Sequence, residues 1–219
     1  MADVEIRPLT PDRWPDLAAL FGEGGDPKWC WCMFYRLRAK DFAANRIADN
    51  RAGLQALTDA AATGDRPAPG LVAYRGERAI GWVSLGPRDD FERLRRSKVI
   101  PAVDARPVWS VICFVVSEAA RGQGLQRPLL KAAIDYAREQ GAEALEAYPV
   151  DTEGTRMSDN ALWTGTLGAF IAAGFEVVGR RLSQSGDPRP DRPIVRLELG
   201  RSAAGDATPA GARGRGMDE

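Results

Sequence analysis

The chain has 219 residues, of which 44% are apolar and 27% are charged, as in an ordinary globular domain. Its 30 basic and 30 acidic residues balance, which gives no sign of a nucleic-acid-binding face. It has no histidine and only three cysteines, so the commonest general base and metal ligand is missing and no disulfide framework is expected. No apolar run approaches the roughly 18 residues of a membrane span, and residues 1–8 lack the apolar stretch of a signal peptide. We therefore expect a cytoplasmic protein with no metal, membrane or nucleic-acid partner.

Apolar periodicity and turn residues divide the chain into strands and helices. In chain order they predict a strand at 4–7, a helix at 10–21, a helix at 39–63, hairpin strands at 71–74 and 79–85, a helical turn at 91–96, a strand at 108–116, a helix at 125–140, a strand at 144–148, a helix at 166–173, and strands at 176–182 and 194–199. Thr10 is placed to cap the first helix, and the second should break near Asn50 or Gly53. This order predicts a mixed α/β fold in one domain, residues 1–200, followed by a disordered tail at 201–219.

The most informative segment joins the strand at 108–116 to the helix at 125–140. The strand is nearly all apolar, as in a central strand buried on both faces. Arg121-Gly122-Gln123-Gly124 follows as a turn that opens the helix. A helix N-terminus offers unpaired N–H groups and the positive end of the helix dipole, which suit a phosphate group. The glycines let the backbone approach such a group, and the arginine can add a charge-assisted contact.

Other glycine motifs fit this turn less well. A Walker loop needs G-x-x-x-x-G-K-[ST], which is absent. A dinucleotide fingerprint needs a third glycine and a place near the first strand of a βαβ unit. A plain strand-to-helix turn without a ligand is the structural alternative.

The segment resembles the signature of the GNAT superfamily of N-acetyltransferases, R/Q-x-x-G-x-G/A after a central strand. Arg121, Gly124 and Gln126 occupy its three fixed positions. A hairpin strand containing Trp82 precedes it, and the segment 170–175 is similar to the family's later L-Y-x-x-x-G-F. The likeness runs from residue 4 to residue 199. It implies a central, mostly antiparallel sheet flanked by helices, in which the two middle strands splay apart and acetyl-CoA lies in the gap.

The resemblance also implies which residues hold the co-substrate. The pantetheine arm would pair with the backbone of Phe114, Val115 and Val116. The diphosphate would lie on the amides of Arg121, Gly122, Gln123, Gly124, Leu125 and Gln126. The acceptor amine would attack the thioester directly, while a backbone amide on the first splayed strand polarises the carbonyl. No metal is implied, and a homodimer is compatible with this fold.

Two residues depart from the family pattern. Gln126 stands where Gly or Ala is usual, so its side chain either crowds the diphosphate or hydrogen-bonds to it. Phe170 replaces a tyrosine that protonates the departing thiolate in many members, so either another group donates this proton or the thiolate leaves without a dedicated acid. Tyr148, at the end of the second splayed strand, is the first substitute, and a rim aromatic without a catalytic role is the alternative.

The general base is also open. An ammonium acceptor must lose a proton before it attacks, and without histidine a carboxylate must serve. Glu146 alternates with apolar neighbours and could face the cleft, while Asp151, Asp90 and Glu118 are further candidates. For each, a solvated surface carboxylate is the alternative. Cys113 lies in an apolar strand without a histidine partner, so we expect it to pack in the core rather than act as a nucleophile.

An aromatic stretch at 29–35 lies where the family usually builds its acceptor pocket. Trp29, Trp31 and Tyr35 are the candidate acceptor-binding residues, for an apolar or cationic acceptor. Packing between helices is the alternative. The two cysteines within the stretch make a poor zinc site without histidine.

These features predict an N-acyltransferase that moves acetyl from acetyl-CoA to a primary amine of an unidentified small molecule or peptide. Two alternatives stay open. A non-catalytic CoA-binding or regulatory module on the same fold would account for Phe170 and Gln126. A protein-interaction domain would use the aromatic stretch, and it predicts that Trp29 and Trp31 are exposed.

Overall fold

The computed structural model describes residues 4–23, 27–152, 157, 161–180 and 192–200. The strands are β1 (Glu5–Pro8), β2 (Gly70–Arg75), β3 (Arg78–Pro87), β4 (Trp109–Val116), β5 (Ala144–Ala147), β6 (Glu176–Arg180) and β7 (Pro193–Glu198). The helices are α1 (Trp14–Gly22), α2 (Pro27–Cys30), α3 (Ala39–Ala44), α4 (Ile47–Ala62), α5 (Glu92–Arg95), α6 (Gln126–Glu139) and α7 (Leu167–Ala172), with 3-10 turns η1 (Pro11–Arg13), η2 (Arg88–Asp90) and η3 (Glu118–Ala120). The predicted tail at 201–219 lies outside the described residues.

The predicted elements are found at their expected places, with two local differences. Thr10 precedes η1 but makes no side-chain cap hydrogen bond. The helix predicted at 39–63 breaks at Asn45 and Arg46, not near Asn50 or Gly53. The break falls there because the Asp49 side chain accepts a hydrogen bond from the Arg46 amide at 2.7 Å and so starts a new helix.

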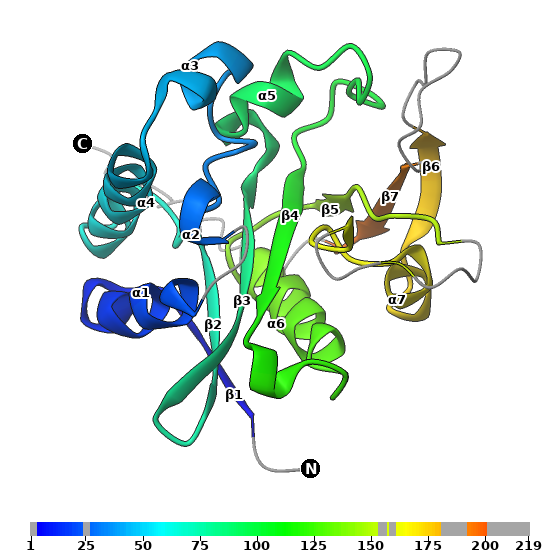
Figure 1. Cartoon of the computed structure of the whole chain (residues 1–219). Coiled ribbons are helices and arrows are strands. Elements are labelled where there is room, and N and C mark those ends of the chain that lie inside the picture. The colour runs from blue at the N-terminus through cyan, green and yellow to red at the C-terminus, as the bar shows by residue number, and fades with distance from the viewer. Residues whose placement is uncertain (1–3, 24–26, 153–156, 158–160, 181–191, 201–219) are drawn as a thin grey trace, which may run out of the picture.

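Within the described part of the chain, one sheet has the strand order β1-β2-β3-β4-β5-β7-β6. Only β4 and β5 pair in parallel, and the other neighbours are antiparallel. Figure 1 shows β1 to β4 in the middle of the molecule, α1 to α4 on one side and β5, β6, β7 and α7 on the other. The predicted mixed α/β fold with a mostly antiparallel sheet is confirmed. Among the described helices, none is long and apolar enough to cross a bilayer.

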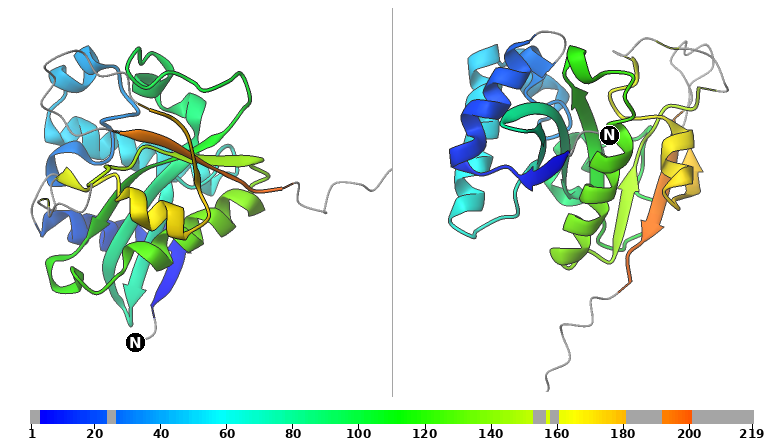
Figure 2. Two further views of the ribbon diagram at one scale, coloured as in Figure 1. Left: turned by 90° about the vertical axis from the view of Figure 1, so that its right-hand side faces the viewer. Right: turned by 90° about the horizontal axis from the view of Figure 1, so that it is seen from below.

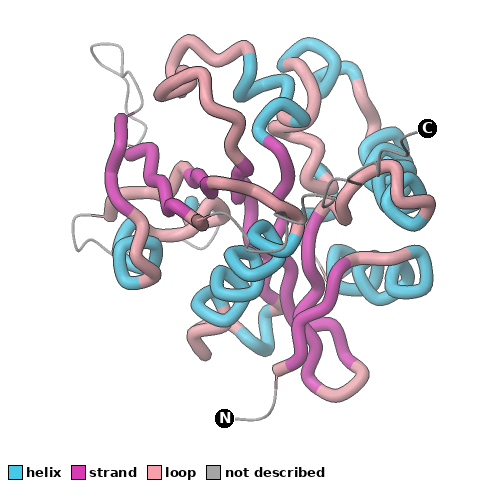
Figure 3. Tube along the Cα trace, turned by 180° about the vertical axis from the view of Figure 1, so that it is seen from behind, coloured by secondary structure: helices cyan, strands magenta, loops and turns pink. Residues whose placement is uncertain are grey.

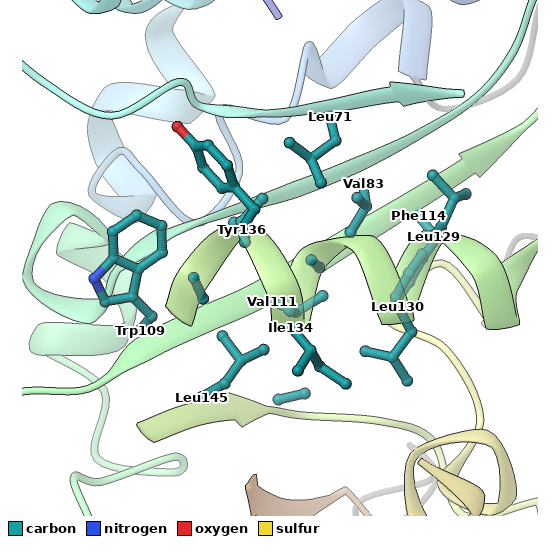
Figure 4. Close-up of a cluster of buried hydrophobic side chains, with 14 of the residues drawn as sticks. Leu71, Val83, Trp109, Val111, Phe114, Leu129, Leu130, Ile134, Tyr136 and Leu145 are labelled. Atoms are coloured by element: carbon teal, nitrogen blue, oxygen red, sulfur yellow. The ribbon is translucent and has the colours of Figure 1, made fainter. Parts of the chain in front are cut away.

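Helices cover both faces of the sheet. Seen from below, α1 and α4 lie on one face and α6 on the other (Figure 2), and the view from behind shows α6 across the strands (Figure 3). Under α6, Leu129 and Tyr136 pack with Val83 of β3 and Val111 of β4 (Figure 4). Leu129 is fully buried, and removing such a side chain from water stabilises the fold by about 1.5–3 kcal/mol. This packing fixes the start of α6 against the end of β4.

A bulge in β4 determines which face its side chains reach. Leu85 of β3 pairs with Val111, but the adjacent Ser84 pairs with Cys113, so Ile112 is an extra residue. An extra residue shifts the alternation of side chains by one. Val111 therefore packs under α6, whereas Ile112 and Cys113 both pack in the core under α1 and α4.

Candidate functional site

The turn between β4 and α6 has the backbone that its glycines predict. Gly122 and Gly124 have φ angles of 71° and 73°, in the left-handed region that favours glycine. A Cβ added at either position would meet no atom within 4 Å, so both face open space. The glycines are therefore needed for the course of the backbone, and they leave its amides uncovered.

The same turn presents backbone donors. In the part of the chain that the structure describes, the amides of Gly122, Gln123 and Gly124 donate to no backbone carbonyl. Pro128, in the first turn of α6, has no N–H to offer, so the donors are concentrated in the turn before the helix. The exposed Arg121 guanidinium lies beside them, with its Nε 3.4 Å from the Val116 carbonyl oxygen. Several free amides, a helix N-terminus and one cation form a suitable site for a diphosphate.

A cavity of about 730 Å³ extends from this turn along β4. Its lining includes Phe114, Val115 and Val116, then Leu125 and Gln126 at the start of α6. Its far end is aromatic and is formed by Trp29, Phe34, Phe42 and Trp163. The cavity is therefore polar at the turn and apolar beyond it, and its volume is in the range of small-molecule and cofactor sites.

The middle strands of the sheet separate, but part of the gap is filled. β4 pairs with β5 only from Trp109 to Val111, and Figure 1 shows the two strands diverging. Beyond that point the Phe114 amide donates a hydrogen bond of 2.7 Å to the Trp163 carbonyl oxygen. In this conformation, the Phe114 amide that we expected to pair with pantetheine is already occupied.

Gln126 and Phe170, the two residues that depart from the family pattern, both lie against Gly165. The Gln126 side chain lies against Gly165, where an added Cβ would sit 2.3 Å from its Nε2, and this nitrogen is buried without a hydrogen-bond partner. Gln126 therefore turns toward the segment before α7 rather than toward the turn. Phe170 is fully buried, with its ring 6.2 Å from that of Phe114 and 5.1 Å from that of Phe175.

Glu146 and Tyr148 belong to a buried ion-pair network. Glu146 is 1% exposed and accepts hydrogen bonds of 2.7 and 3.1 Å from Arg196 and one of 3.2 Å from Tyr148, with the Arg88 guanidinium 3.6 Å away. The Tyr148 hydroxyl also contacts Ser110 at 3.0 Å. Burial and the nearby Glu146 carboxylate raise the pKa of Tyr148. Glu146 faces a second cavity of about 520 Å³, and neither residue is among those lining the larger one. This geometry favours a structural role for both and argues against the predicted acid and base.

None of the other carboxylates considered as bases is among the residues that line the larger cavity. Asp90 is paired with Arg66. Asp151 lies 3.9 Å from Arg180, and Glu118 is exposed at the start of η3.

The predicted acceptor residues are divided between cavity and core. Trp29 lines the cavity and is 57% exposed. Trp31 is buried, with its ring stacked 5.7 Å from that of Trp14, and Tyr35 is buried against Tyr148. The prediction that Trp31 is exposed, made for a protein-interaction domain, is therefore wrong.

Sequence reasoning missed three aromatic residues that line the cavity. Phe34 belongs to the aromatic stretch but was not singled out, whereas Phe42 and Trp163 come from other segments. The ring of Trp163 lies 5.7 Å from that of Phe34. Only the folded chain brings them together, so no local pattern identifies them. No group of three potential metal ligands occurs among the described residues.

Comparison with known proteins agrees with this geometry. The model of the acetyltransferase (GNAT) family matches residues 31–159, which is more than half of the chain. No curated protein matches the sequence.

Solved structures of low sequence identity share the fold. The GNAT-family acetyltransferase from Streptococcus pneumoniae has a TM-score of 0.52 and 16% identity, over 90% of this chain and 100% of that one. Salmonella typhimurium yncA, solved with its cofactor acetyl-CoA, has a TM-score of 0.51 and 18% identity, over 94% and 99%. The PaiA N-acetyltransferase from Thermoplasma acidophilum, in complex with coenzyme A, has a TM-score of 0.50 and 14% identity, over 90% and 99%.

Proposed function

The chain belongs to the GNAT acetyltransferase family, and from this premise we propose that it transfers acetyl from acetyl-CoA to a primary amine by direct attack in a ternary complex. The observation that carries the proposal is the turn at 121–124. It combines two left-handed glycines, uncovered amides and an arginine in the lining of a large cavity. Structural neighbours solved with acetyl-CoA or coenzyme A support acetyl-CoA as the donor.

The cavity suggests how the co-substrate would be held. The amides of Gly122, Gln123 and Gly124 would bind the diphosphate, and Arg121 would add charge. The thioester arm would run along Val115 and Val116 toward the aromatic end. The bound thioester supplies the acyl group, and the protein's part is to hold it beside the acceptor and to exclude water.

The aromatic end of the cavity is the place for the acceptor. Trp29 is accessible there, and the apolar lining would hold the hydrocarbon part of a small molecule or peptide. Glu146 and Tyr148 are no part of this mechanism, because their hydrogen bonds hold them in the ion-pair network.

A non-catalytic CoA-binding module is the second candidate, and one observation favours it. The Phe114 amide is bonded to the Trp163 carbonyl oxygen, so a donor on the first splayed strand is not free to polarise a thioester in this conformation. The buried Phe170 also offers no proton to a departing thiolate.

Two measurements distinguish these functions. Calorimetry with acetyl-CoA, CoA and ATP should give heat with the first two only, because ATP lacks the pantetheine arm. Failure of millimolar acetyl-CoA to bind would reject both candidates. Thiol release from acetyl-CoA over a panel of primary amines, with acetylated product identified by mass spectrometry, supports the enzyme. Tight binding without release supports the module.

A further inference from the structure

The aromatic end of the larger cavity lies against positive charge. Four rings form this end: Trp29, Phe34, Phe42 and Trp163. The Lys28 ammonium lies 5.5 Å from the centre of the Trp29 ring. The Arg93 guanidinium lies 4.0 Å from the centre of the Phe34 ring and 5.7 Å from that of Phe42. The Arg192 guanidinium lies 5.6 Å from the centre of the Trp163 ring. Each of the four rings therefore has a cation of the protein within the range of a cation–π contact.

Carboxylates of the described residues do not neutralise two of these cations. Neither Arg93 nor Lys28 forms an ion pair with one, and Glu92, beside Arg93 in sequence, pairs with other arginines. Arg93 instead donates a hydrogen bond of 2.7 Å to the carbonyl oxygen of Phe34, which is a neutral acceptor. Burial lowers the pKa of Arg93, but a guanidinium keeps its charge in proteins. Among the described lining residues the only charged one is Arg121. The charges at and behind this lining are therefore positive from the turn to the aromatic end.

This arrangement decides between the apolar and the cationic acceptor that the aromatic stretch at 29–35 allowed. An aromatic cage binds a cation through the negative faces of its rings. Here the rings already lie against cations of the protein, which would repel a further positive charge. An uncharged aromatic molecule meets no such repulsion, and it can stack on these rings or pack against their edges. The aromatic end therefore favours an uncharged aromatic acceptor.

An uncharged acceptor also needs no general base before it attacks. An alkylamine resembles the lysine side chain, whose pKa is about 10.4, so only about 1 in 2,500 molecules is uncharged at pH 7. The protein would have to take a proton from the others, but the carboxylates considered as bases do not line the cavity. In an arylamine the nitrogen lone pair is delocalised into the ring, so the nitrogen is already uncharged at neutral pH.

We propose that the acceptor is an arylamine, an aromatic amine whose nitrogen carries no charge at neutral pH. This inference rests on the proposed function and names the class of its acceptor. The nitrogen lone pair attacks the carbonyl carbon of the thioester, the C–N bond forms and the C–S bond breaks. One proton leaves the nitrogen and ends on the departing sulfur, which gives an N-aryl acetamide and the thiol of coenzyme A. The nitrogen becomes acidic as its lone pair enters the new bond, so this step needs no tyrosine in place of Phe170.

Two ligands of the same shape and different charge test the cavity without turnover. Benzyl alcohol is uncharged, and benzylammonium carries one positive charge at pH 7. Calorimetry on the protein saturated with coenzyme A should show benzyl alcohol binding about tenfold more tightly, or better. Equal affinities, or tighter binding of benzylammonium, would overturn the proposal.

Substitutions identify the cations that are responsible. Arg93→Met and Lys28→Met each remove a charge and keep an unbranched side chain, so each should strengthen benzylammonium binding several-fold and leave benzyl alcohol nearly unchanged. Arg95→Met and Lys98→Met are the matched controls, because both side chains are exposed and neither makes a cation–π contact with a described ring of the cavity. Thermal melting checks folding, and the exposed Lys28 keeps the test decisive if Arg93→Met does not fold. Folded variants that bind benzylammonium no better than the controls would overturn the proposal.

Turnover separates this inference from the proposed function. Thiol release and mass spectrometry follow the acetylation of aniline and of benzylamine between pH 6.5 and 8.5. At pH 7, kcat/KM for aniline should exceed that for benzylamine about tenfold or more. It should stay nearly constant over the pH range, whereas the value for benzylamine should rise about tenfold per pH unit, because only its uncharged form reacts. A preference for benzylamine at pH 7 would overturn the acceptor class and leave the proposed function standing. If the protein binds acetyl-CoA but acetylates no amine, both fail.

Discussion

Replacing Gly124 by alanine tests whether the turn binds the diphosphate. A control variant is needed to measure the cost of placing alanine in a left-handed conformation. Gly124 has a φ of 73° and faces open space, so alanine clashes with nothing and suffers only from its dihedral. That conformation costs about 1–2 kcal/mol in a residue with a Cβ. Gly141, just after α6, has a φ of 78° and equally open surroundings. Gly141→Ala is therefore a control with the same backbone strain, at the opposite end of the helix.

The two variants should lose similar stability and differ in binding. At Gly124, relief of the strain turns an amide away from the diphosphate. A hydrogen bond to a charged group contributes about 1.5–3 kcal/mol, so its loss weakens acetyl-CoA binding by roughly 10- to 100-fold. Gly141→Ala should bind like the wild type. Calorimetry gives the affinities, and urea unfolding gives the stabilities. Equal affinities in the two variants would refute the assignment of the turn as the diphosphate site.

Three further substitutions test other parts of the site. Arg121→Gln should weaken acetyl-CoA binding and reduce its dependence on salt, because an exposed cation next to the ligand is lost; titrations at two salt concentrations measure this. Glu146→Gln should destabilise the fold by about 3–5 kcal/mol in urea unfolding, because the buried Arg88 loses its carboxylate partner, whereas Arg196 keeps Asp104. Adding Arg88→Met should recover part of that loss. Trp29→Ala should raise the KM for an amine acceptor with little change in melting temperature, because the side chain is mostly exposed.

Sequence reasoning located the elements well where a pattern is local. The apolar run that became β4, the amphipathic face of α6 and the glycine turn between them depend on neighbours in sequence. Gly122 and Gly124 could be predicted because only glycine adopts their backbone conformation without strain.

Features that depend on distant partners could not be predicted in this way. Alternation suggested that Glu146 faces the cleft, but Arg196 and Arg88 occupy both of its oxygens, and nothing near Glu146 in sequence indicates them. The extra residue Ile112 gives no signal in an unbroken apolar run, although it decides where Cys113 points. The aromatic lining of the cavity could not be predicted for the same reason, since Trp163 joins it from a separate segment.

The contact between Phe114 and Trp163 makes the co-substrate and the protein compete for one amide. If pantetheine pairs with β4 at this position, the Trp163 carbonyl oxygen must first release the Phe114 amide. The Trp163 ring packs 5.7 Å from that of Phe34 and 5.6 Å from that of Tyr35, which holds the segment in place. Trp163→Ala removes these ring contacts and should loosen the hydrogen bond.

The competition has a measurable size. A neutral backbone hydrogen bond contributes about 0.5–1.5 kcal/mol, so acetyl-CoA should bind Trp163→Ala roughly 2- to 10-fold more tightly than the wild type. Trp163→Phe keeps a ring at this position and serves as the control with near wild-type affinity. Amide hydrogen exchange on the free proteins should show faster exchange at Phe114 in Trp163→Ala alone. Faster exchange there without tighter binding would mean that the ligand does not use the Phe114 amide, and the pantetheine arm would then have to run along Val115 and Val116 only.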